Sequence, residues 1–128
     1  MKLRVARHTT DLRPIIHFYK DILGLEVLGE FNDHDQYDGV FLGLENLGWH
    51  LEFTTSDQAP EHQPDKDDQL VFYVESEAQL LQLAARFEKH KIPTVQSANP
   101  YWLVNGITYQ DPDGFCLTIS VQKPNTAF

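Results

Sequence analysis

The chain has 128 residues and a formal net charge of −9, with ten Lys and Arg against nineteen Asp and Glu. Its 41% hydrophobic and 23% charged residues are typical of a globular protein rather than a disordered one. No apolar run approaches the roughly 18 residues of a membrane-spanning helix. The acidic balance disfavours binding to a phosphate backbone, so we expect neither nucleic acid nor a membrane as a partner.

Two features of the sequence favour a reducing cytoplasm. The first residues, MKLRVARHTTDLRP, carry charges where a secretory signal needs an apolar stretch. The single cysteine, Cys116, excludes an internal disulfide. The net negative charge would favour a cationic or amphipathic ligand, although acidity of this kind also serves solubility alone.

The first half of the chain predicts one strand, one helix and three further strands. Residues 2–8 form the first strand, and Thr10 or Asp11 caps a helix that ends near Leu23, before Gly24. Three short strands follow over residues 26–31, 40–44 and 49–54. The next segment, SDQAPEHQPDKDD, has no apolar periodicity and is expected to be an exposed linker.

The second half repeats this order. A strand over residues 69–74 precedes a helix capped by Ser76, and strands follow over residues 94–96, 106–110 and 116–121. Arg4 and Gln69 are 65 positions apart, and Glu52 and Thr118 are 66 apart. A nearly constant offset indicates an internal duplication, although two unrelated α+β segments can also show similar spacing.

Alternation along four strands separates an apolar face from a mixed polar face. We expect the apolar residues to lie under the helices, including Leu3 and Val5 in the first strand. The opposite face should carry polar side chains from both halves and, since it is not needed for the core, should meet a ligand. The residues assigned to it include Arg4, His8, His50, Glu52, Gln69, Tyr73 and Thr118.

The segment TTDLRPIIHFYKDILGLEVL resembles the first-module signature of the glyoxalase, bleomycin-resistance and dioxygenase superfamily, also called vicinal oxygen chelate (VOC). The strand HLEFT and the turn DPDGF before the last strand match as well. The resemblance implies an α+β fold of two βαβββ modules whose mixed sheets form a cup-shaped half-barrel. It divides a single domain, residues 1–128, into a first module near 1–55, a linker over 56–67 and a second module near 68–123. It also implies a homodimer.

Metal-dependent members of this superfamily hold a divalent ion with one residue from the first and one from the last strand of each module. Those positions are Arg4, Glu52, Gln69 and Thr118 here. Arginine has no lone pair to donate and threonine is a poor ligand, so we expect no metal at the usual positions and no other cofactor. Arg4 beside Glu52 would take the place of the metal, either as a ligand anchor or as a purely structural ion pair.

An altered metal site is the alternative. His8, His50 and Glu52 share the polar face and offer two imidazoles and a carboxylate, which suit one Zn, Ni, Fe or Mn ion. His8 lies four residues beyond the family's ligand position, a displacement of roughly 13 Å along the strand.

The sequence therefore leaves two functions open. The first is a metal-independent protein of the bleomycin-resistance type, which binds a small molecule through Arg4, His50, Glu52, Gln69, Tyr73, Trp102 and Thr118. The second is a VOC enzyme, of the lyase, thiol transferase or dioxygenase type, with a reassigned metal or with Glu52 as the catalytic base. An arginine next to Glu52 would stabilise its carboxylate and weaken it as a base, which favours binding.

Overall fold

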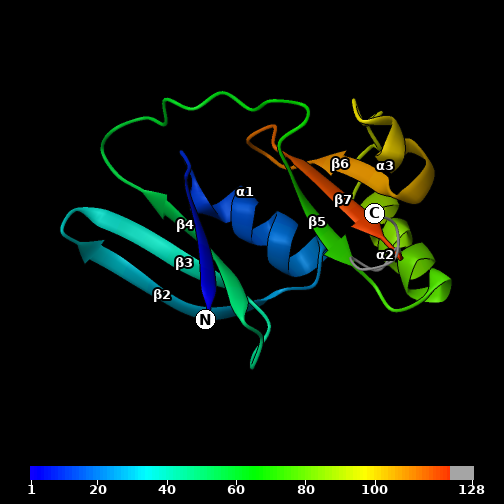
Figure 1. The fold of residues 1–128 in the computed structure, drawn as a ribbon. Coiled ribbons are helices and arrows are strands. Elements are labelled where there is room, and N and C mark those ends of the chain that lie inside the picture. Colours follow the sequence, from blue (N-terminus) through cyan, green and yellow to red (C-terminus); the bar gives the residue numbers. More distant parts are fainter. Residues whose placement is uncertain (122–128) are drawn as a thin grey trace. The chain divides into compact units, whose positions relative to one another are not determined.

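The computed structural model describes residues 1–121, and the chain divides between His62 and Gln63 into two units, the first and second modules (Figure 1). Each module has its own mixed sheet: four strands in the order β1-β4-β3-β2 in the first, and three in the order β5-β7-β6 in the second. The prediction of an α+β fold with two modules is confirmed. The predicted end of the second module, near residue 123, lies outside the described residues.

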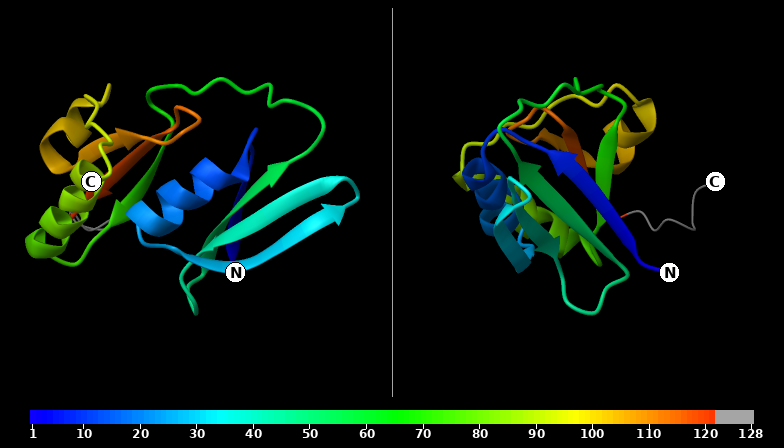
Figure 2. Two further views of the ribbon diagram at one scale, coloured as in Figure 1. Left: turned by 180° about the vertical axis from the view of Figure 1, so that it is seen from behind. Right: turned by 90° about the vertical axis from the view of Figure 1, so that its left-hand side faces the viewer.

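The first module contains β1 (Leu3–His8), α1 (Leu12–Ile16), η1 (His17–Ile22), β2 (Glu26–His34), β3 (Tyr37–Gly43) and β4 (Trp49–Thr55). Strand β1 pairs in parallel with β4, whereas β2, β3 and β4 are antiparallel. The helix covers one face of this sheet (Figure 2). It starts at Asp11, whose carboxylate accepts a hydrogen bond from the Arg13 backbone N–H at 3.0 Å.

The helix widens into π-helical turns over η1. The Leu23 N–H donates to the Phe18 carbonyl at 2.9 Å, five residues back instead of four. Consecutive aromatic residues, Phe18 and Tyr19, are thereby both buried against the sheet, and the rings of Tyr19 and Phe53 lie 5.0 Å apart. Gly24 then ends the helix with a φ of 98°, as the sequence predicted.

The second module contains β5 (Gln69–Tyr73), α2 (Glu77–Lys89), α3 (Pro100–Asn105), β6 (Ile107–Gln110) and β7 (Cys116–Ser120). Its core includes Phe87, Leu117 and Ile119, each fully buried. Ser76 caps α2 by accepting from the Gln79 N–H at 3.2 Å, as predicted. In the DPDG turn, the Asp111 carboxylate accepts from the backbone N–H groups of Asp113 and Phe115 at 2.9 and 3.0 Å.

The registers of the two parallel strand pairs support an internal duplication. In the first module Arg4 lies opposite His50, and in the second Gln69 lies opposite Cys116. The predicted offset of 65 residues relates Arg4 to Gln69, and the offset of 66 relates His50 to Cys116. The order β5-β7-β6 in the second module therefore corresponds to β1-β4-β3 in the first.

Two local predictions are wrong. Leu3 and Val5 are not buried under the helix but remain 58% and 40% exposed, because β1 is the edge strand and α1 packs against β3 and β4. The strand expected over residues 94–96 is reduced to one bridge between Val95 and Thr108. The short helix α3, which contains Trp102, was not predicted.

Candidate functional site

The polar face of the first module gathers Arg4, His50 and Glu52. Arg4 lies on β1 directly opposite His50 on β4, and its Nε donates to His50 Nε2 at 2.9 Å. His50 therefore accepts through Nε2, which places its own proton on Nδ1. Arg4 also approaches Glu52, with 3.8 Å between a guanidinium nitrogen and a carboxylate oxygen. The side chain of Arg4 is 51% exposed, whereas that of Glu52 is only 15% exposed.

Phe41 provides an aromatic floor beneath this cluster. The guanidinium carbon of Arg4 lies 4.7 Å from the centroid of the Phe41 ring, within cation–π range. The rings of Phe41 and His50 meet edge-on with centroids 5.8 Å apart. The Arg4 guanidinium is thus positioned by the Phe41 ring and by its hydrogen bond to His50, while half of the side chain remains exposed to solvent.

The aromatic surface continues from β3 onto β2. The ring of Phe31 lies 5.8 Å from that of Phe41 and directly over Gly39, its register partner. A Cβ at Gly39 would overlap the Phe31 ring, so the glycine makes the room that this ring occupies. An apolar strip therefore adjoins the cation of Arg4.

His8 lies at the far end of β1 from Arg4. Its register partner is Thr54, its Nε2 lies 3.1 Å from the Ser56 hydroxyl, and its backbone carbonyl accepts from His62 Nε2 at 2.8 Å. These contacts anchor the start of the linker to the sheet. Within residues 1–121, no group of three His, Cys, Asp or Glu side chains is placed to hold a metal ion.

The polar face of the second module is a hydrogen-bonded chain of three side chains. The Thr118 hydroxyl donates to Gln69 Oε1 and shares a 2.7 Å hydrogen bond with the hydroxyl of Thr108 on β6. Since Thr118 uses its proton on Gln69, Thr108 is the donor in the second bond. Thr118 is fully buried, so its hydroxyl is already committed within the protein.

Tyr73 and Trp102 lie at the margins of this face. Tyr73 ends β5 opposite Ser120, whose hydroxyl donates to the Asn105 carbonyl at 2.5 Å and ties β7 to α3. Trp102 on α3 meets Tyr101 edge-on at 4.8 Å. It also lines a cavity of about 220 Å³, together with Leu103, Thr108 and Ser97 among other residues.

The four positions that the resemblance assigns to a metal do not fit one. Arg4 carries only N–H donors, and these are directed at His50 and Glu52. Thr118 donates its proton to the amide oxygen that Gln69 would need for coordination. Glu52 alone is a ligand of the expected kind, and its carboxylate is paired with the Arg4 guanidinium.

Sequence reasoning missed Phe41, Phe31 and Thr108. Val40, Phe41 and Leu42 form an unbroken apolar run, in which alternation marks no polar face. The pairing of β3 with β4 shows that Phe41 is on the polar face, because it lies opposite Glu52. Helix α3 did leave a signal: Asn99 caps it by accepting from the Tyr101 N–H at 3.0 Å, and Pro100 occupies its first turn.

The fold is shared with glyoxalase I and FosX. The trypanothione-dependent glyoxalase I of Leishmania major superposes with a TM-score of 0.73 at 24% identity, over 94% of this chain and 85% of that one. FosX, a fosfomycin resistance protein of Listeria monocytogenes, gives a TM-score of 0.71 at 14% identity, over 94% and 91% of the two chains. At this identity the similarity is one of fold.

A nearer relationship is found with YycE of Bacillus subtilis, an uncharacterized protein, which is 41% identical over 125 residues, or 95% of this chain and 88% of YycE. A crystal structure of a YycE protein of unknown function from that organism gives a TM-score of 0.88 at 38% identity, over 99% and 93% of the chains. Models of the YycE-like N-terminal and C-terminal domains match residues 3–54 and 67–120. The chain therefore belongs to the YycE-like family, within the superfamily that the sequence resembles.

Proposed function

We propose that this protein binds a small organic molecule on the polar face of the first module's sheet, with Arg4 in the role that a divalent metal plays elsewhere in the superfamily. The observation that carries the proposal is the geometry of Arg4. Its guanidinium is fixed over Phe41 and bonded to His50, and its side chain is half exposed. A preorganised, accessible guanidinium is a good partner for a carbonyl, carboxylate or phosphonate oxygen.

The surroundings of Arg4 define the rest of the ligand. Phe41 and Phe31 form a continuous apolar strip beside the cation, which suits a flat or apolar body. The largely buried Glu52 carboxylate neutralises part of the positive charge of Arg4, which limits how strongly a small inorganic anion would bind. We therefore propose an amphipathic ligand that presents an acceptor oxygen to Arg4. His50 and Glu52 line its site in the first module. Taken by itself, the polar face of the second module is proposed to use Gln69, Tyr73, Trp102 and Thr118 to contact or support a ligand.

Phenylphosphonate tests this proposal, because it combines an oxygen-rich anion with one ring. The choice is also guided by the dihydroxypropylphosphonic acid bound to the Listeria FosX. Isothermal titration calorimetry should show saturable binding that Arg4→Gln weakens at least about tenfold, since a hydrogen bond to a charged group contributes roughly 1.5–3 kcal/mol. Arg13→Gln, the same charge change at an arginine that is 89% exposed, is the matched control.

Metal dependence is tested with the same protein. Thermal unfolding with nickel, zinc, iron(II) or manganese should show no specific stabilisation, and phenylphosphonate binding should survive a chelator. Near-stoichiometric metal in untagged protein purified without chelator would refute the proposal and favour the enzyme hypothesis. Equal losses in the Arg4 and Arg13 variants would refute the role of Arg4.

We also propose that the protein works as a homodimer in the cytoplasm. The exposed side chains of Leu3 and Val5 on edge strand β1 support a partner there, because apolar edge strands are usually covered. The one cysteine is free and buried, which suits a reducing compartment. No helix within residues 1–121 is long and apolar enough to cross a membrane. Sedimentation of the wild type and of Val5→Glu would test the dimer, which the glutamate should dissociate.

A further inference from the structure

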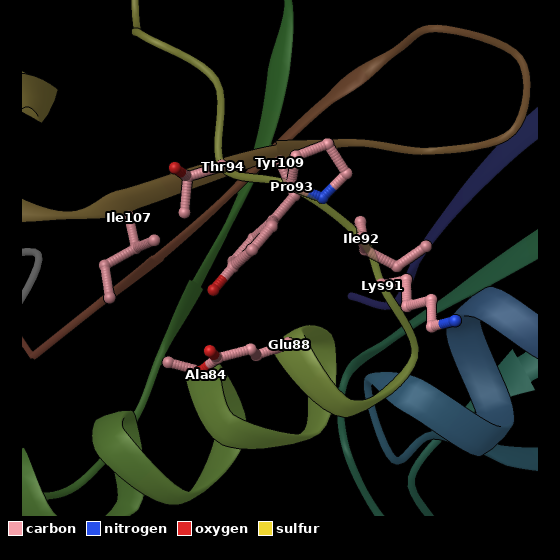
Figure 3. Close-up of a pocket in the computed structure, with 8 residues that line it drawn as sticks. All are labelled: Ala84, Glu88, Lys91, Ile92, Pro93, Thr94, Ile107 and Tyr109. Atoms are coloured by element: carbon pink, nitrogen blue, oxygen red, sulfur yellow. The ribbon is translucent and has the colours of Figure 1, made fainter.

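A second cavity, separate from the polar face, opens in the second module between α2 and β6 (Figure 3). Its volume is about 400 Å³, within the usual range for small-molecule sites. Along β6 the side chains alternate, so Ile107 and Tyr109 point away from Thr108, which bonds to Thr118. The cavity is therefore on the helix side of the sheet. Its walls include Ala84, Glu88, Ile92, Thr94, Ile107 and Tyr109.

Tyr109 forms a rigid wall of this cavity. Its ring stacks on Phe87, with centroids 3.9 Å apart and an interplanar angle of 14°, and the residue is only 2% exposed. In Figure 3 the hydroxyl end of the ring is directed toward α2, where Glu88 and Ala84 lie. The phenol thus offers a polar atom inside an otherwise apolar wall.

Glu88 supplies the charge at this site. Within residues 1–121 its carboxylate takes part in no ion pair and no side-chain hydrogen bond. Burial raises the pKa of Tyr109, and the negative charge of Glu88 raises it further. Lys91, the one cation of the lining, extends away from Tyr109 in Figure 3.

We propose that this cavity is a second binding site, specific for a lipophilic ammonium ion. The Glu88 carboxylate accepts from the ammonium group, the Tyr109 hydroxyl offers a further acceptor, and the apolar body lies against Ile92 and Ile107. A free carboxylate beside an apolar cavity favours a cation over a neutral or anionic ligand of the same shape. The net charge of −9 also raises the local concentration of cations.

The probe is 2-phenylethylammonium, with 2-phenylethanol and phenylacetate as neutral and anionic molecules of similar shape. In a titration followed by ¹H–¹⁵N NMR, the ammonium should give saturable shifts centred on residues 84–94 and 107–109. Glu88→Gln should weaken it about fivefold, the upper end for an exposed ion pair. Glu77→Gln, at the other end of α2, makes the same charge change and should leave the affinity unchanged.

Ala84→Phe fills the cavity and should abolish the binding, with a dispersed spectrum showing that the variant folds. Because Glu88→Gln keeps the shape of the side chain, the test stands even if the phenylalanine variant does not fold. No saturable binding, equal affinity for the three molecules or an equal loss in Glu77→Gln would overturn the proposal. Arg4→Gln should not affect the ammonium, and Glu88→Gln should not affect phenylphosphonate, so either site can fail without the other.

Discussion

Replacing Thr118 with Val tests whether the polar face of the second module is held by its own hydrogen bonds. The substitution removes the hydroxyl that donates to Gln69 and accepts from Thr108. Gln69 is partly exposed and can turn to water, but Thr108 is 4% exposed and its hydroxyl would be left buried without a partner. A lost bond together with an orphaned donor costs about 2 kcal/mol.

The double variant Thr108→Val, Thr118→Val separates the two contributions. It removes both hydroxyls, so no buried donor is orphaned between them, and it should lose at least about 1 kcal/mol less than the two single variants together. Equilibrium urea unfolding, followed by circular dichroism and by tryptophan fluorescence, measures the free energies, and unchanged m values would show that the denatured state is unaltered. A loss below about 0.5 kcal/mol for Thr118→Val, or strict additivity, would refute the reasoning.

Two further predictions concern stability. Ser76→Ala removes the cap of α2 and should cost about 1 kcal/mol in the same urea assay, whereas Ser76→Asp should retain most of that stability. Burial, followed by the charge of Asp111, raises the pKa of the Cys116 thiol. The folded protein then keeps a proton that the unfolded chain releases, so stability should fall as the pH rises past the ordinary thiol pKa of about 8.5. Cys116→Ser should flatten that part of the pH profile, and an unchanged slope would exclude the thiol.

The features that the sequence predicted are those encoded by a few neighbouring residues. Gly24 ends its helix because a left-handed residue was needed there, and Ser76 caps α2 through a hydroxyl three residues before its donor. In β4, Leu51 and Phe53 are buried while His50 and Glu52 face the other way, as alternation requires. Arg4 and Glu52 lie close together on the parallel pair β1 and β4, as the resemblance to the superfamily implied.

The features that were missed depend on contacts between distant residues. Apolar spacing does not distinguish the hydrogen bond from Leu23 to Phe18 from an ordinary α-helical one, so the widening at η1 was not predictable from pattern. Leu3 and Val5 alternate as a buried strand would, yet edge position leaves them exposed. The buried Thr118 hydroxyl is hydrogen-bonded to Thr108 on the neighbouring strand β6. The sequence alone does not show that these two residues lie opposite each other.

In the second module, one expected strand is reduced to the bridge between Val95 and Thr108. This affects the local unfolding of that module. In the first module the corresponding edge is the long β2, paired with β3 from Glu26 to His34. A single bridge protects far fewer amide protons from exchange with solvent than a full ladder of hydrogen bonds does. Hydrogen exchange in the segment from Thr94 to Asn105 should therefore proceed through small local openings, without unfolding of the sheet behind it. That segment contributes Thr94 to the walls of the two cavities described above, so a ligand could enter either one at little energetic cost.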